Sequence, residues 1–176
     1  MSIVSRGLTK VEVRLRWNPS PLGQVPRHLD IIAGTYAEAD SWGQPVYVTH
    51  SDSRSPDGTI TMTRHSQTGQ GFGFVEAMVL ELDRLATDYS RVVVGVAIHQ
   101  KGVSRTFADM SNVGVVVVEG YRELFSDDFG AVAGSTAATV AEFVRDESGA
   151  WEMRAMIRGF DSDPAAFATE MGRTQQ

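Results

Sequence analysis

The chain has 176 residues, of which 42% are hydrophobic and 22% charged, so its composition is that of a globular protein and argues against disorder. It carries 16 basic and 22 acidic residues, and this formal net charge of −6 argues against a nucleic-acid-binding protein, which ordinarily has a basic stripe. The absence of cysteine excludes disulfides, thiolate metal sites and a cysteine nucleophile, and it fits a reducing compartment.

The aliphatic runs are informative because none is long enough to cross a membrane. The longest span residues 92–98 and 113–118, and the first ten residues contain no apolar signal core. We therefore expect a soluble, cytoplasmic protein with no membrane contact. Its length suits one domain, residues 1–176, with a single core.

The first half of the chain has the pattern of short strands separated by turns. Apolar and polar side chains alternate from residue 11 to residue 17, which predicts a strand with one face in water. Further β-rich segments lie at residues 30–36, 46–49 and 59–64. Between the last two, Ser55-Pro56-Asp57-Gly58 is typical of a type I turn, with proline at its second position and glycine at its last.

A glycine-rich loop follows at residues 67–73. Its glycine spacing differs from that of a dinucleotide-binding fingerprint, and it lacks the lysine of a P-loop. Glycines at alternate positions suit a loop whose backbone closely approaches another group, or a tight connection between strands. Residues 76–86, which come next, fit a strand or a strand followed by a helical turn.

The second half contains further strands and one helix. Residues 92–98 and 115–118 are β-branched and continuously apolar, as expected of central strands buried on both faces. Strand-like segments return at residues 139–145 and 151–157. Asp163 and Pro164 then supply an N-cap and a first-turn proline for a helix over residues 165–171. Together the elements predict an all-β fold with little helix, either an antiparallel sandwich or a barrel.

Four polar residues near these turns are candidate metal ligands. His28 and Asp30 lie two apart and would share one face of a strand, while Asp57 lies in the type I turn and His65 stands just before the glycine-rich loop. Together they could form a mixed His/Asp metal site. The simpler interpretation is that all four are surface loop residues, as most such residues are.

Hydrolytic catalysis has little support in the pattern. There is no Gly-x-Ser-x-Gly elbow, and scattered serine, histidine and aspartate residues do not by themselves indicate a triad. His50 and His99 have no obvious carboxylate partner nearby, so we expect both to be structural or solvated. No catalytic residue is therefore predicted.

Several segments occur in a characteristic order. They are Leu15-Arg16-Trp17, His28-Leu29-Asp30, Ser55-Pro56-Asp57-Gly58-Thr59-Ile60 and Thr68-Gly69-Gln70-Gly71-Phe72-Gly73, then the valine-rich strand ending near Ile98, Thr106-Phe107, Asn112, Trp151-Glu152-Met153-Arg154-Ala155 and Gly159-Phe160. In this order, over residues 11–160, they resemble the TerD family of tellurite-resistance and stress-response proteins. The resemblance implies a two-sheet antiparallel β-sandwich that binds calcium through acidic loops. The family is associated with bacterial stress resistance and is not known as an enzyme.

The calcium ligands that the resemblance implies fall in two places, and the sequence is divergent in both. They are an Asp-x-Asp strand, here His28-Leu29-Asp30, and the acidic loop from Ser55 to Glu76. The acidic positions of the family that are replaced here are His28, His65, Gln70, Phe72 and Phe74-Val75, whereas Asp30, Asp57 and Glu76 remain. Calcium takes six to eight oxygens, several of them carboxylates, while imidazole suits zinc and other transition metals.

We therefore expect a non-enzymatic, TerD-like stress-response binding module whose calcium site is largely degraded. Its partners would be other proteins, not nucleic acid or membranes, and no cofactor is expected beyond the calcium that the resemblance implies. One alternative is a weak divalent-metal site at Asp30 and Asp57, to which His28, His65 and Gln70 contribute. The other is a metal-dependent hydrolase built on the two histidines and two aspartates.

Overall fold

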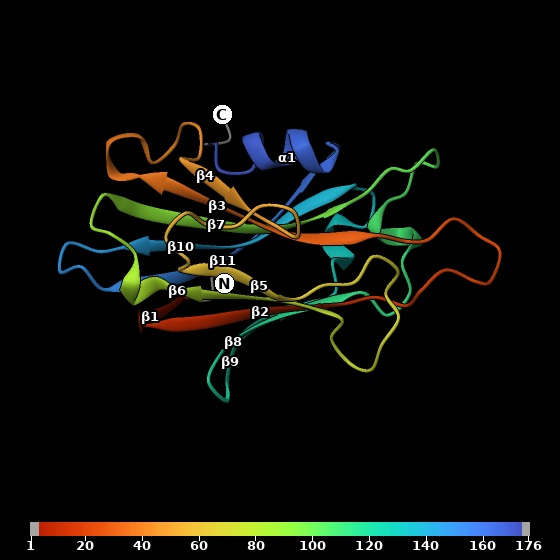
Figure 1. The fold of residues 1–176 in the computed structure, drawn as a ribbon, viewed down its shortest axis with the longest axis horizontal. Coiled ribbons are helices and arrows are strands. Elements are labelled where there is room, and N and C mark those ends of the chain that lie inside the picture. Colours follow the sequence, from red (N-terminus) through yellow and green to blue (C-terminus); the bar gives the residue numbers. More distant parts are fainter. Residues whose placement is uncertain (1–3, 174–176) are drawn as a thin grey trace.

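The computed structural model describes residues 4–173, which form two β-sheets and one short helix (Figure 1). In chain order the elements are β1 (Val4–Leu8), β2 (Lys10–Arg16), β3 (Leu29–Ala37), β4 (Tyr47–Thr49), β5 (Ile60–Arg64), β6 (Glu76–Glu81), β7 (Tyr89–Ile98), β8 (Gly114–Glu119), β9 (Arg122–Asp127), β10 (Ala137–Arg145), β11 (Trp151–Phe160) and α1 (Pro164–Glu170). No helix in this part of the chain is long and apolar enough to span a membrane.

The strands form an antiparallel sandwich of two sheets that do not close into a barrel. The larger sheet has the order β1-β11-β10-β7-β3-β4 and the smaller has the order β5-β6-β2-β8-β9. The recorded strand pairs are all antiparallel. The predicted fold class, a two-sheet antiparallel β-sandwich with one short C-terminal helix, is confirmed.

The main core lies between the two sheets. Every second residue of β2 points into it, and Val11, Val13 and Leu15 are fully buried there. A second, smaller core lies on the outer face of the six-stranded sheet, under α1 (Figure 1). Phe167 of the helix fills this core where Gly95 of β7 leaves room, because a Cβ atom at residue 95 would collide with the phenylalanine ring.

Two strands were missed by the sequence analysis, and several of the predicted strands are longer than expected, such as β7, β10 and β11. The strands β1 and β9 were not predicted, because each is short and carries few apolar residues. The ambiguous segment 76–86 is resolved as strand β6 followed by a 3-10 turn at Leu82–Arg84. The helix α1 begins as predicted, with Asp163 Oδ1 accepting a hydrogen bond from the Ala166 N–H at 2.8 Å.

The topology brings four strand ends together at one end of the sandwich. In the larger sheet, the start of β3 pairs with the end of β7, so that Leu29 lies opposite Ile98. In the smaller sheet, the end of β5 pairs with the start of β6, so that Arg64 lies opposite Ala77. Residues just outside these pairs therefore share one region at the edge of the core.

Candidate metal centre

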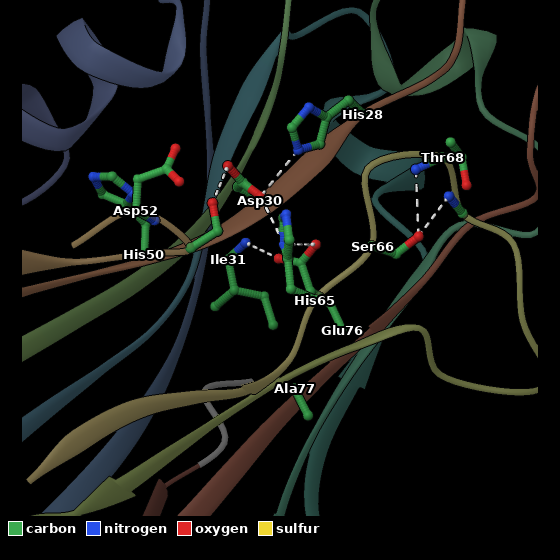
Figure 2. Close-up of polar contacts among 12 residues, drawn as sticks. His28, Asp30, Ile31, His50, Asp52, His65, Ser66, Thr68, Glu76 and Ala77 are labelled. Atoms are coloured by element: carbon green, nitrogen blue, oxygen red, sulfur yellow. Dashed lines mark hydrogen bonds and ion pairs between the residues drawn. The ribbon is translucent and has the colours of Figure 1, made fainter. Parts of the chain in front are cut away.

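Five titratable side chains gather where these strand ends meet, and we call them the Asp30 cluster. They are His28, Asp30, His65, Glu76 and His99. Asp30 lies in β3, Glu76 begins β6, and the three histidines lie immediately before β3, after β5 and after β7. Figure 2 shows His28, His65 and Glu76 grouped around Asp30.

Asp30 is the centre of the cluster. Its Oδ1 lies 3.3 Å from His28 Nε2 and 3.6 Å from His65 Nδ1, and its Oδ2 lies 2.8 Å from His99 Nε2. Burial by itself raises the pKa of the Asp30 carboxyl, but the polar contacts of the carboxyl with His28 and His99 outweigh burial and hold the pKa well below its ordinary value. Asp30 is therefore ionised although it is buried.

Glu76 has the opposite electrostatic state. Its side chain is fully buried, its Oε1 accepts a hydrogen bond from the Ile31 N–H at 3.0 Å, and its Oε2 lies 3.4 Å from His65 Nδ1. Burial, together with the negative charge of Asp30, raises the pKa of Glu76 to about 9. Two carboxyl groups in one cluster therefore titrate far apart, which is a common feature of functional sites.

The three imidazoles differ in packing and exposure. The rings of His28 and His99 stack with centroids 3.8 Å apart, because the His99 N–H donates to the His28 carbonyl at 2.8 Å and so continues the β3–β7 ladder. The His65 ring lies across from them, with its centroid 5.7 Å from that of His28. The side chain of His28 is buried, whereas those of His65 and His99 are 29% and 28% exposed. Solvent therefore reaches the cluster past His65 and His99.

Several buried polar atoms of the cluster have no hydrogen-bond partner within residues 4–173. They are both ring nitrogens of His28, Oδ1 of Asp30 and Oε2 of Glu76. An unsatisfied buried polar atom costs about 1–3 kcal/mol, so native proteins rarely retain several in one place without a role. Two overlapping sets share Asp30, and the ligand atoms within each set lie within 4.8 Å of one another: His28/Asp30/His99 and Asp30/His65/Glu76. The cluster can thus accept a cation.

The structure brings together three of the five predicted site residues, namely His28, Asp30 and His65. Asp57 is exposed, and its Oδ1 accepts hydrogen bonds from the N–H and hydroxyl of Thr59, at 3.1 and 2.7 Å, inside the turn. Gln70 is exposed in the glycine-rich loop. The interpretation of the four candidate ligands as surface loop residues thus suits the exposed Asp57 and His65, although His65 lies in the cluster. It is wrong for His28 and Asp30, which are 6% and 4% exposed.

Two members of the cluster were not among the predicted site residues. We expected His99 to lack a carboxylate partner, and this is wrong, because its Nε2 lies 2.8 Å from Asp30. Sixty-nine residues separate the two in sequence, and only the β3–β7 register joins them. Glu76 was noted as a surviving acidic position, and its role depends on the pairing of β6 with β5. His50, by contrast, lies outside the cluster and accepts the Asp52 N–H at 3.1 Å.

Calcium, which the resemblance implies, does not fit these residues. Among the described residues, only Asp30 and Glu76 bring carboxyl groups into the cluster. The other three groups are imidazoles, whereas calcium takes six to eight oxygen ligands. The donor set is instead the mixed nitrogen and oxygen set that suits zinc and similar ions.

Comparison with known proteins gives a consistent result. Residues 1–171 match the family model described as the TerD domain. A solved structure described as a homologue of telluride resistance protein (TerD), from Streptomyces coelicolor A3(2), is 64% identical, with a TM-score of 0.94 over 96% of this chain and 100% of that one. An uncharacterized protein, YceE of Bacillus subtilis (strain 168), is 28% identical over 94% of this chain and 89% of its own length. The tellurium resistance protein TerD of an Alcaligenes species is 25% identical over 74% and 69%.

Proposed function

Since the chain belongs to the TerD family, we propose that it is a non-enzymatic, tellurium-resistance-associated binding protein whose binding centre is the Asp30 cluster. The observation that carries this proposal is the set of buried, unsatisfied polar atoms around Asp30 in the described part of the chain. These atoms lie at the family's Asp-x-Asp strand, where the resemblance places ligand binding. The cluster occupies the position of the family's calcium site but has histidines where the family has carboxylates. This difference suits a binding protein whose ligand is no longer calcium.

Loss of the family's calcium site is part of this proposal. Asp57 and Gln70, at two family ligand positions, lie outside the described cluster, and His28 and His65 replace carboxylates at two others. Too few charged oxygens are left to hold calcium tightly. The binding centre therefore works without calcium.

A non-enzymatic role is supported by the shape of the surface. Substrate sites are ordinarily concave and lined by the catalytic groups. One hollow lies over the outer face of the five-stranded sheet, where it is lined by residues such as Arg16, Phe74 and Val116. The side chains of His28, Asp30 and Glu76 in the cluster are buried, and none of them lines that hollow.

The partners in this proposal are other proteins in the cytoplasm. The loop between His65 and Glu76 carries Phe72, whose side chain is 97% exposed, which is unusual for a large apolar residue. The absence of cysteine supports a reducing compartment. The loop that supplies two members of the Asp30 cluster thus also presents apolar surface to a partner.

Growth on tellurite tests this proposal. A tellurite-sensitive bacterium would express the wild-type chain, Asp30→Asn or the matched control Asp57→Asn, with folding checked by circular dichroism. We expect the wild type and Asp57→Asn to restore growth and Asp30→Asn to fail, because only Asp30 lies in the cluster. The purified wild type should release no product from nitrophenyl esters or phosphates with any divalent metal. Equal rescue by Asp30→Asn, or metal-dependent turnover, would contradict the proposal.

A further inference from the structure

We propose that the Asp30 cluster binds a zinc-class transition-metal ion in place of the family's calcium, with Asp30 Oδ1, His65 Nδ1 and Glu76 Oε2 as ligands. This inference rests on the proposed function only in taking the cluster as the binding centre. It adds the chemical class of the ion and assigns a ligand role to Glu76.

The spacing of His65 Nδ1 from the two carboxyl oxygens is close to that of ligands around a tetrahedral ion. Zinc binds nitrogen at about 2.0–2.1 Å and carboxylate oxygen at about 2.0–2.2 Å, so two ligands of a tetrahedral site lie about 3.3–3.5 Å apart. His65 Nδ1 lies 3.4 Å from Glu76 Oε2 and 3.6 Å from Asp30 Oδ1. The three ligand atoms all lie within 4.8 Å of one another, so one ion can be shared among them after side-chain adjustment.

The atoms that need a partner are the atoms that would bind the ion. Asp30 Oδ1 and Glu76 Oε2 are both buried and lack hydrogen-bond partners among the residues that the structure describes. His28 Nε2, equally without one there, lies 3.3 Å from Asp30 Oδ1 but belongs to the other set of ligand atoms, with His99. The 29% exposure of His65 gives the ion a path from solvent.

The other oxygen of each carboxyl group is already held in place. Asp30 Oδ2 lies 2.8 Å from His99 Nε2, and Glu76 Oε1 accepts the Ile31 N–H at 3.0 Å. Such contacts behind the ligands fix their orientation and are typical of metal sites. His99 is therefore a positioning residue for Asp30 in this assignment. The remaining oxygens of Asp30 and Glu76 both approach the His65 ring (Figure 2).

The donor types select the class of ion. Imidazole nitrogen suits zinc, copper, iron and nickel, whereas calcium and magnesium prefer oxygen alone. One imidazole and two carboxyl groups make up the assigned set, and two further imidazoles stand beside it. This composition resembles zinc sites with histidine and carboxylate ligands, and it is poor for calcium.

Metal titration of the EDTA-stripped full-length protein tests the inference. Melting temperature would be followed with micromolar zinc and with millimolar calcium, for the wild type, His65→Ala, Glu76→Gln and the control His50→Ala. We expect zinc to raise the melting temperature of the wild type and the control to a saturating value, because ligands of the folded state alone stabilise it. The two cluster variants should lose this rise, and calcium should give none.

Nitrogen NMR of the histidine rings keeps the test independent of whether the variants fold. In the wild type, zinc should shift the His65 ring resonances at substoichiometric additions while those of His50 stay unchanged. A zinc response in both variants equal to that of the wild type, a larger response to calcium, or an unshifted His65 would each overturn the inference. If the wild type restores growth on tellurite but shows no zinc response, the zinc assignment is wrong and the proposed function stands. If it responds to zinc but does not restore growth, the proposed function is wrong and the zinc assignment stands.

Discussion

Strand β7 has a buried polar cluster near each end, and the two clusters differ in how many of their polar atoms have a partner. We call the first, formed by Arg91 and Glu142, the Arg91 cluster. Near the start of β7, Arg91 Nε donates to Glu142 Oε2 at 3.0 Å, and Arg91 Nη2 forms an ion pair with the same oxygen at 2.9 Å. Its Nη1 donates to the carbonyls of Ser41 and Gly172, at 3.1 and 2.5 Å. The planar group also lies over the Trp42 ring at 4.0 Å. Every nitrogen of this side chain thus has a partner.

The Asp30 cluster, just beyond the end of the same strand, has fewer hydrogen bonds, and its remaining contacts are longer, at 3.3–3.6 Å. Four of its buried nitrogen and oxygen atoms have no hydrogen-bond partner in residues 4–173. A saturated buried ion pair joins elements of the fold, here β7, β10 and the segment after α1. An unsaturated cluster at an equally buried position retains binding capacity. The difference separates a structural use of buried charge from a ligand-binding one.

Removal of Arg91 tests the structural half of the comparison and should have the largest effect. Arg91→Met leaves the Glu142 carboxylate buried without its partner, and the loss of one member of a buried pair costs about 3–5 kcal/mol. Urea unfolding at pH 7 would measure it. The control is Arg122→Ala, which removes an exposed pair with Glu119 and should cost about 0–1 kcal/mol. Similar losses of unfolding free energy in the two variants would refute a structural role for the Arg91 cluster.

Asp30→Asn should have the next largest effect on the metal-free protein. The substitution removes the charge that three imidazoles surround, and we expect a loss of about 1–3 kcal/mol at pH 7. Folding lowers the pKa of Asp30, so its contribution is present above the unfolded-state pKa of about 3.9 and is lost as pH falls toward the folded-state value. Urea unfolding in EDTA at pH 7 and pH 3 should therefore show a smaller difference from wild type at pH 3. A difference that grows in acid would contradict this account.

Glu76→Gln should flatten the pH dependence of stability. The folded-state pKa of Glu76 is raised to about 9, so between about pH 4.3 and pH 9 the folded protein keeps a proton that the unfolded chain has lost. Stability consequently falls as pH rises through this window, by at most about 1.4 kcal/mol from pH 7 to pH 8. Urea unfolding of both proteins in EDTA at those two pH values would measure the slope. Equal slopes would show that Glu76 does not titrate in this way.

The sequence predicted the fold better than the site, and the two clusters show why. The alternation in residues 11–17 predicts a strand with one buried face, because successive side chains of a strand point to opposite sides. The β-branched run at residues 92–98 predicts a strand buried on both faces. The partner of a given residue depends instead on register across distant strands. His99 and Glu142 were both invisible as partners for this reason, since pairing of β7 with β3 and β10 brings them to Asp30 and Arg91.

Within the site, the sequence located the residues that lie near a recognisable motif. His28, Asp30 and His65 follow from the family pattern, and all three are in the cluster. Asp57 belongs to the same pattern but bonds to Thr59 within its own turn, a local contact that aspartate readily makes. Spacing alone does not tell which of two carboxylates turns inward.

Ser51→Ala should have the smallest effect on stability, and it tests whether the Ser51 hydroxyl helps to hold Asp30 in place. The Ser51 hydroxyl donates to Asp30 Oδ2 across 3.4 Å, near the limit for a hydrogen bond, while His99 Nε2 holds the same oxygen at 2.8 Å. Because the stronger partner stays, we expect a change within about 0.5 kcal/mol in urea unfolding and an unchanged response to zinc. A loss above about 1 kcal/mol would mean that the hydroxyl carries part of the anchoring of Asp30. Asp30 Oδ2 would then be held by strong partners, as the Arg91 guanidinium is. Only the atoms beside His65 and Glu76 would remain to bind an ion.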